Sequence, residues 1–92
     1  LEMGRWLCYR TLWLRDRGLP HTREAAMCKM LIPPTAAAAA HECLVLHGHY
    51  GYTRDFPIEQ RLRDLIGQEI ADGTPQIMKL IVARELFGRD FV

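Results

Sequence analysis

The stretch of this sequence best suited to chemistry is EIADGTPQIMK, residues 69–79. It places a carboxylate, Asp72, ahead of Gly73, Thr74 and a helix expected to open at Pro75. The dipole of a helix favours an ionised carboxylate at its N-terminus, and an ionised carboxylate can accept a proton as a general base. Free N–H groups at the same place suit an anionic ligand. Asp before a helix and Thr as its N-cap are also common for structural reasons alone, so both interpretations stay open.

Two histidines, His47 and His49, flank Gly48 and form the only other cluster that suggests a ligand site. Zinc sites in proteins use three or four side-chain ligands. No third ligand follows at helical spacing, so we expect no metal here.

Several classes of active site are excluded by composition. The sequence has no serine and no nucleophile elbow, and its cysteines have no adjacent base. It also has no glycine-rich loop of the kind that holds phosphates. Lys and Arg number 12 against 11 Asp and Glu, without a basic run, so we expect no nucleic-acid partner.

Length and hydrophobicity set the scale of the fold. Ninety-two residues allow one domain, and 49% of them are hydrophobic. The longest apolar stretch falls short of the roughly 18 to 20 residues that cross a bilayer, so we expect no membrane segment. Three widely spaced cysteines, Cys8, Cys28 and Cys43, suggest buried thiols in a reducing compartment. Because LEMGRW lacks the features of a signal peptide, we expect a cytoplasmic protein.

The periodicity of apolar residues predicts two helices in the first half of the chain. The first covers residues 1 to about 17, with Trp6 and Trp13 as core candidates. The second begins after the cap Thr22 and reaches about residue 47, and Pro33-Pro34 are expected to cause a kink or a restart at Thr35. Five alanines follow, at positions 36–40, and should let a neighbouring helix approach closely.

Two further helices are predicted in the second half. The segment 47–57 has no periodicity and is expected to be a loop. A third helix then starts at Pro57, and a fourth runs from the cap Thr74 to the stop at Gly88, with Met78 in the core. Four helices with short connections predict an all-α, up-and-down four-helix bundle. The neighbours Arg63-Asp64 and Arg84-Glu85 are expected to form buried ion pairs at its helix contacts.

Several ordered motifs resemble the C-terminal helical domain of the acyl-CoA dehydrogenases. These flavoproteins oxidise the α–β bond of acyl-CoA thioesters. The motifs are a glycine-rich turn with an aromatic-Thr-Arg segment, an Arg-Asp pair, an acidic-Gly-Thr-x-Gln-Ile segment and Ala-Arg-Glu. Here they stand as HGHYGYTR (47–54), RD (63–64), DGTPQI (72–77) and ARE (83–85), and the earlier YRTLWLRDRGLPHTREAAMCKM is similar to the two preceding family helices. The likeness covers nearly the whole chain.

The resemblance implies that Asp72 is the catalytic base, which removes the α proton while the β hydride passes to the flavin. Most relatives carry Glu at this place, and Asp reaches about 1.5 Å less. Relatives that oxidise cyclic acyl-CoA substrates use Asp there, which suggests an alicyclic or otherwise unusual acyl group. The alternative, known in some relatives, is a base further upstream with Asp72 as a helix-start residue.

The resemblance also implies residues that bind cofactor and substrate. Gly73 would contact the acyl-CoA thioester, and Thr74 and Gln76 would contact FAD. The segment Val45, Leu46, His47, Gly48 and His49 matches one that touches FAD across a subunit boundary. Val45 stands where relatives often have a polar residue and His49 where they have glycine, so only backbone contacts are expected to persist.

We therefore expect the C-terminal domain, residues 1–92, of a larger three-domain FAD-dependent acyl-CoA dehydrogenase that is inactive as an isolated piece. The expected partners are an acyl-CoA substrate, further copies of the chain in a dimer or tetramer, and an electron-transferring flavoprotein as implied by resemblance. The alternative is a non-catalytic helical module for assembly or interaction, derived from the same family.

Overall fold

The computed structural model describes residues 1–90, and its regular structure over this range is entirely helical. The helices are α1 (Glu2–Asp16), α2 (Thr22–Leu46), α3 (His49–Tyr52), α4 (Ile58–Ile70) and α5 (Pro75–Phe87). The all-α class is confirmed, and the four long helices lie where the sequence predicts them. The additional element, α3, is a single turn within the segment expected to be a loop.

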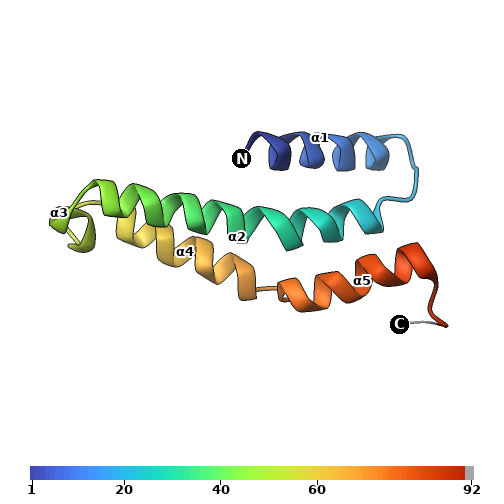
Figure 1. Cartoon of the computed structure of the whole chain (residues 1–92). Coiled ribbons are helices and arrows are strands. Elements are labelled where there is room, and N and C mark those ends of the chain that lie inside the picture. Colours follow the sequence, from blue (N-terminus) through green and yellow to red (C-terminus); the bar gives the residue numbers. More distant parts are fainter. Residues whose placement is uncertain (91–92) are drawn as a thin grey trace.

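Helix α2 is the centre of the molecule. Figure 1 shows α1 along one side of α2, and α4 and α5 end to end along the other side. Contacts join α2 to each of the other four helices, in a body of 50 × 27 × 18 Å. The arrangement is therefore three layers deep where α1 lies beside the N-terminal half of α2, and two layers deep beyond it (Figure 1).

The two consecutive prolines do not divide α2. The restart expected at Thr35 does not occur, because the helix continues from Thr22 to Leu46 through Pro33 and Pro34. Thr35 donates its hydroxyl proton to the carbonyl oxygen of Leu31 at 2.7 Å, across the prolines. Packing against helices on both sides of α2 outweighs the local preference of proline to end a helix.

The contacts of α2 are made by small side chains. Ala26, Ala37 and Ala40 are buried, with exposed fractions of 5%, 7% and 9%. On α1, a methyl group at Gly4 would lie 3.0 Å from the side chain of Ile32. The close approach predicted for the alanine stretch is confirmed for Ala37 and Ala40.

The prediction for the aromatic residues of α1 is wrong. Trp6 and Trp13 are 66% and 50% exposed, whereas Leu14 is buried and Leu7 is half-buried. Helical periodicity allows either face of α1 to point inward, and the face with small and aliphatic residues is the one that fits against α2. Met78, the third core candidate, is buried as predicted.

Two other expectations of burial are also corrected. Cys8 and Cys28 are half-buried, but Cys43 is exposed. The side chains of the expected ion pairs are all exposed, and no ion pair involving them occurs within residues 1–90: Arg63, Asp64, Arg84 and Glu85. Both pairs lie on exposed faces of α4 and α5, where charged side chains stay hydrated and gain little from pairing.

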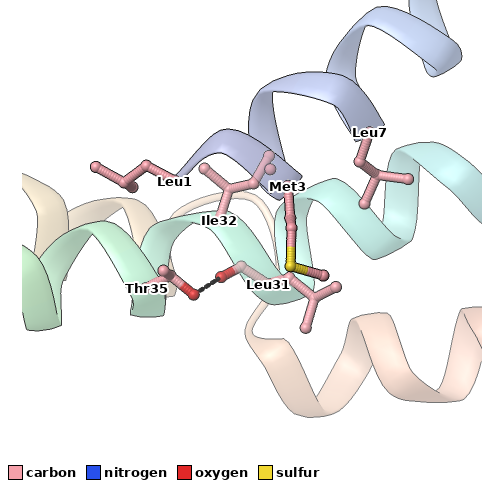
Figure 2. A pocket seen from close by; sticks show the side chains of 7 residues that line it. Leu1, Met3, Leu7, Leu31, Ile32 and Thr35 are labelled. Atoms are coloured by element: carbon pink, nitrogen blue, oxygen red, sulfur yellow. Dashed lines mark hydrogen bonds between the residues drawn. The ribbon is translucent and has the colours of Figure 1, made fainter.

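An apolar groove of about 370 Å³ lies where the start of α1 meets the middle of α2. Figure 2 shows the side chains of Met3 and Leu7 from α1 beside those of Leu31 and Ile32 from α2. The groove continues the α1–α2 contact toward the N-terminal end of the described chain. None of the helices described for residues 1–90 has the length and hydropathy needed to cross a membrane.

The start of α2 holds one buried charge. Thr22 is the first helical residue rather than the cap, which is His21. Glu24 is only 6% exposed and accepts hydrogen bonds from Arg23 at 2.7 and 3.1 Å. These bonds lower the pKa of Glu24 below its usual value of 4.5, against the effect of burial, and the charge of Arg10 adds to the lowering.

We predict that Glu24→Gln destabilises the fold in a pH-dependent manner. A lowered pKa in the folded state contributes stability that is present above the unfolded pKa and is lost as the pH falls through the folded pKa. Urea unfolding should show the variant as less stable at pH 7, with the difference shrinking below about pH 4.5. Glu42→Gln, an exposed position on the same helix, is the control. A difference that persists unchanged to pH 3 would contradict this assignment.

Candidate functional site

The residues singled out for chemistry lie in the tight turn between α4 and α5. Asp72 has a φ of +59°, rare for a residue other than glycine, and Gly73 has a φ of +115°. Thr74 caps α5 as predicted, with its side-chain oxygen accepting from the N–H of Ile77 at 3.4 Å. Two residues outside the usual backbone regions therefore carry the chain from α4 into the first turn of α5.

The carboxylate of Asp72 has no hydrogen-bonding or ion-pairing partner among the described residues. The residue is exposed, and within residues 1–90 its side chain takes part in no hydrogen bond or ion pair. A carboxylate without such partners keeps its lone pairs available for a proton. The geometry is therefore compatible with a general base.

The start of α5 also offers donors to a ligand. Among the described residues the backbone N–H groups of Gly73 and Gln76 have no backbone acceptor, and Pro75 has no N–H at all. Unpaired N–H groups at a helix N-terminus suit oxyanions and carbonyl oxygens. Asp72 and these donors thus share one turn of the chain.

Lys29 of α2 contacts this turn and the end of α4. Its ammonium group donates to the carbonyl oxygen of Gly73 at 3.0 Å and to that of Glu69 at 3.5 Å, and also to the carbonyl oxygen of Gln68. Gln68 and Glu69 lie in the last turn of α4, where carbonyls lack helical partners. A cation is favourable at that end of a helix.

The turn borders an open concavity of about 600 Å³ between the first turns of α2 and the α4–α5 junction. Its lining residues come from three helices and the turn: His21, Thr22, Ala25, Ala26, Lys29, Gln68, Asp72, Met78 and Ile81. The lining combines aliphatic surface with a few polar groups, as small-molecule sites do.

The second predicted group of cofactor residues lies elsewhere. Val45 and Leu46 end α2 with exposed fractions of 57% and 85%, and His47 and His49 are also exposed. At 1.5 Å per residue, Val45 is about 24 Å along α2 from Lys29. One copy of the chain therefore does not bring segment 45–49 to Asp72.

The local structure of segment 45–49 is a helix end followed by a turn. His47 has its Nδ1 atom 2.7 Å from the carbonyl oxygen of Cys43, and Gly48 adopts a φ of +68°. Within residues 1–90 no group of three metal-ligating side chains comes together. This segment therefore offers a neighbour its backbone atoms, the aliphatic side chains of Val45 and Leu46 and the exposed imidazole groups of His47 and His49.

Comparison with known proteins decides the family. The family model described as acyl-CoA dehydrogenase, C-terminal domain, matches residues 1–87. The chain belongs to the acyl-CoA dehydrogenase family. This confirms the resemblance on which the assignment of Asp72 and its neighbours was based.

Individual acyl-CoA dehydrogenases show how far the similarity extends. The chain is 36% identical over 87 residues to the short-chain specific acyl-CoA dehydrogenase of Clostridium acetobutylicum, covering 95% of this chain and 23% of that protein. It is 36% identical over 86 residues to cyclohexane-1-carbonyl-CoA dehydrogenase of Syntrophus aciditrophicus, covering 94% of this chain and 22% of that protein. Among solved structures, the FAD complex of PigA superposes on this chain with a TM-score of 0.89. The two are 30% identical, and the match covers 96% of this chain and 23% of that one.

The chain thus spans less than a quarter of the length of these acyl-CoA dehydrogenase relatives. It corresponds to their C-terminal domain, and the remaining parts of such proteins lie outside the 92 residues. The fold of that domain is therefore established for this chain, whereas the activity of a whole enzyme is a matter of proposal.

Sequence reasoning missed Lys29 and His21 as residues of the site. The signal for Lys29 was present, because it follows buried Ala26 by three positions and so lies on the inward face of α2. A lysine on a buried helical face needs polar partners. Which carbonyls provide them depends on how α4 and α5 pack, and this cannot be read from α2 alone.

We predict that Gly73→Ala distorts the turn. A methyl group at Gly73 would lie 2.5 Å from the terminal carbon of Met78, at a φ that disfavours L-residues. The expected cost is about 1 kcal/mol or more in the free energy of unfolding, measured by urea denaturation.

Gly67→Ala is the matched control, since Gly67 lies inside α4 with open space around its Cα. There the same change should stabilise by about 0.5–1 kcal/mol through helix propensity. Equal effects of the two substitutions would show that the turn conformation is unimportant.

Proposed function

We propose that residues 1–92 are the C-terminal domain of a three-domain FAD-dependent acyl-CoA dehydrogenase, and that Asp72 is its catalytic base. The observation that supports this most directly is the turn before α5, which presents an exposed, unpartnered carboxylate beside unpaired N–H groups. On this proposal the 92 residues are inactive without the rest of the enzyme. They provide the proton acceptor but only part of the walls of a pocket.

In the proposed reaction the turn has two roles, proton abstraction and contact with the thioester. Asp72 takes the α proton of the thioester, and Gly73, next to it, contacts the thioester group. FAD, when bound, supplies the acceptor for the β hydride. The fit of this chain to the cofactor rests on the unpaired N–H of Gln76 and on the cap Thr74 at the start of α5, a position suited to the oxygens of a diphosphate.

Segment 45–49 would contact FAD held mainly by another copy of the chain. Its position about 24 Å along α2 from Lys29 is compatible with a contact across a subunit boundary. Gly48, with its φ of +68°, leaves the backbone uncovered there, and Val45 and Leu46 present apolar surface. The electron acceptor proposed for the enzyme is an electron-transferring flavoprotein.

The shorter side chain of Asp72, compared with Glu, affects which acyl group the proposed enzyme would accept. Asp reaches about 1.5 Å less than Glu, a large difference for a proton transfer between fixed groups. An alicyclic or otherwise unusual acyl group would place its acidic carbon differently. The similarity to cyclohexane-1-carbonyl-CoA dehydrogenase supports this substrate class. The chain is equally identical to a short-chain specific acyl-CoA dehydrogenase, so a linear acyl-CoA is tested beside the cyclic one.

We predict that Asp72→Asn in the full-length protein abolishes the reduction of bound flavin by an acyl-CoA while the flavin stays bound. Asn has nearly the shape of Asp but cannot accept the proton as a base. Stopped-flow absorbance after mixing with butyryl-CoA or cyclohexane-1-carbonyl-CoA measures the rate. The loss should reach 100-fold or more, on the order of what general-base catalysis contributes.

Asp64→Asn, an exposed change on α4 away from the turn, is the matched control and should react like the wild type. An Asp72→Asn variant with unchanged rates would place the base upstream. A full-length protein without any flavin would instead support the non-catalytic assembly module.

We also propose that the enzyme is a homo-oligomer, a dimer or a tetramer. Large apolar side chains are exposed on α1 and at the end of α2, among them Trp6 at 66% and Leu46 at 85%. Covering such surfaces is a common reason for association. Their burial in a subunit interface would also bring segment 45–49 to a neighbouring cofactor.

Sedimentation of the full-length protein should therefore show a stable oligomer, and Leu46→Glu should weaken it, because a charge would be buried at the contact. His41→Glu changes an exposed residue of the same helix and serves as the control. A compact monomer at high protein concentration would contradict the proposal.

A further inference from the structure

Lys29 forms hydrogen bonds with backbone carbonyls that precede and follow Asp72 in the sequence. Its ammonium group donates to the carbonyls of Gln68 and Glu69, before Asp72, and to that of Gly73, directly after it. An ammonium group has three N–H donors, so the end of α4 and the turn after it together use all three. No carboxylate within residues 1–90 forms an ion pair with Lys29.

The backbone at Asp72 needs such a restraint. A φ of +59° is uncommon for a residue with a Cβ, although Asp adopts it more readily than most. The turn itself is short, and among residues 1–90 the side chain of Asp72 makes no hydrogen bond or ion pair that could hold the backbone. Lys29 reaches the turn from α2, the central helix, to which both α4 and α5 are packed.

We propose that Lys29 is the positioning residue for Asp72: it fixes the α4–α5 turn from α2 and thereby sets where the carboxylate meets the substrate. The inference rests on the proposed function. Lys29 does not touch the reacting atoms, since its three donors are taken by carbonyl groups. Its positive charge also complements the C-terminal end of α4, next to the turn.

Lys29→Met is the first test, in the full-length protein. Met keeps much of the length of the side chain and removes the donors and the charge. The rate of flavin reduction by butyryl-CoA or cyclohexane-1-carbonyl-CoA should fall about 10- to 100-fold, the scale of a misplacement by about 1 Å. The thioester concentration giving half the maximal rate should change little, because Lys29 does not bind the thioester.

Two further measurements separate positioning from a general loss of stability. With butyryl-CoA deuterated at the α carbon, the isotope effect on flavin reduction should be larger in Lys29→Met, because proton abstraction by a misplaced base becomes slower than the other steps. Hydrogen exchange, which needs no activity, should be faster at the amides of residues 71–74 and unchanged at the centre of α2.

Lys79→Met is the matched control, an exposed lysine of α5 without a hydrogen bond among the described residues. It should match the wild type in all three measurements. Lys29→Arg keeps the charge, but its planar donors cannot converge on three carbonyls as an ammonium does. It should give an intermediate rate and remains measurable should Lys29→Met fail to fold.

The outcomes are distinct. A wild-type protein whose flavin is not reduced by either thioester refutes the proposed function, and exchange at residues 71–74 still tests the hold of Lys29 on the turn. An active wild type with unchanged rate, isotope effect and exchange in Lys29→Met overturns the positioning role. Failure of both Lys29 variants to fold would make Lys29 a folding residue and would also overturn it.

Discussion

One charge on the central helix organises the site. Lys29 is half-buried, and its ammonium group donates to three carbonyl oxygens. The carbonyls that α4 leaves unpaired at its end provide two of these partners, and the turn after it provides a third. Lys29 has N–H groups that need acceptors, and the end of α4 has carbonyls that need donors. The same hydrogen bonds satisfy both. On our proposal, this contact fixes the position of Asp72.

The remainder of the fold serves α2 as the shared support. Helices α4 and α5 lie end to end along it (Figure 1), and the turn between them contacts α2 at Lys29, in the N-terminal half of that helix. Small residues such as Ala37 and Ala40 let these helices come close, but they bury little apolar area per residue. The large apolar side chains instead remain on the outside of α1 and at the end of α2. Exposed apolar surface of this kind is typical of contacts with other protein surfaces.

Predictions from sequence were successful where a local rule decides the outcome. Thr74 and Pro75 start α5 because the cap and the first helical position have strong local preferences, and Gly88 ends it for the same reason. Predictions from sequence were wrong where two arrangements of a helix satisfy the same local pattern. The face of α1 that carries Trp6 and Trp13 and the face that carries Leu7 and Leu14 are both compatible with one helix, and only the shape of α2 selects between them.

The sequence by itself determined the class of the fold, the limits of its long helices and the family, because these follow from residue types and their order along the chain. It also marked Asp72 and Gly73, through a motif that is contiguous. The tertiary structure alone decided that Lys29 reaches this motif across more than forty positions of sequence, contacting Gly73 with a separation of 44. It also decided that segment 45–49 lies far from the motif. The physical reason is that both depend on how rigid helices pack side by side, and no local preference of the chain encodes such distances.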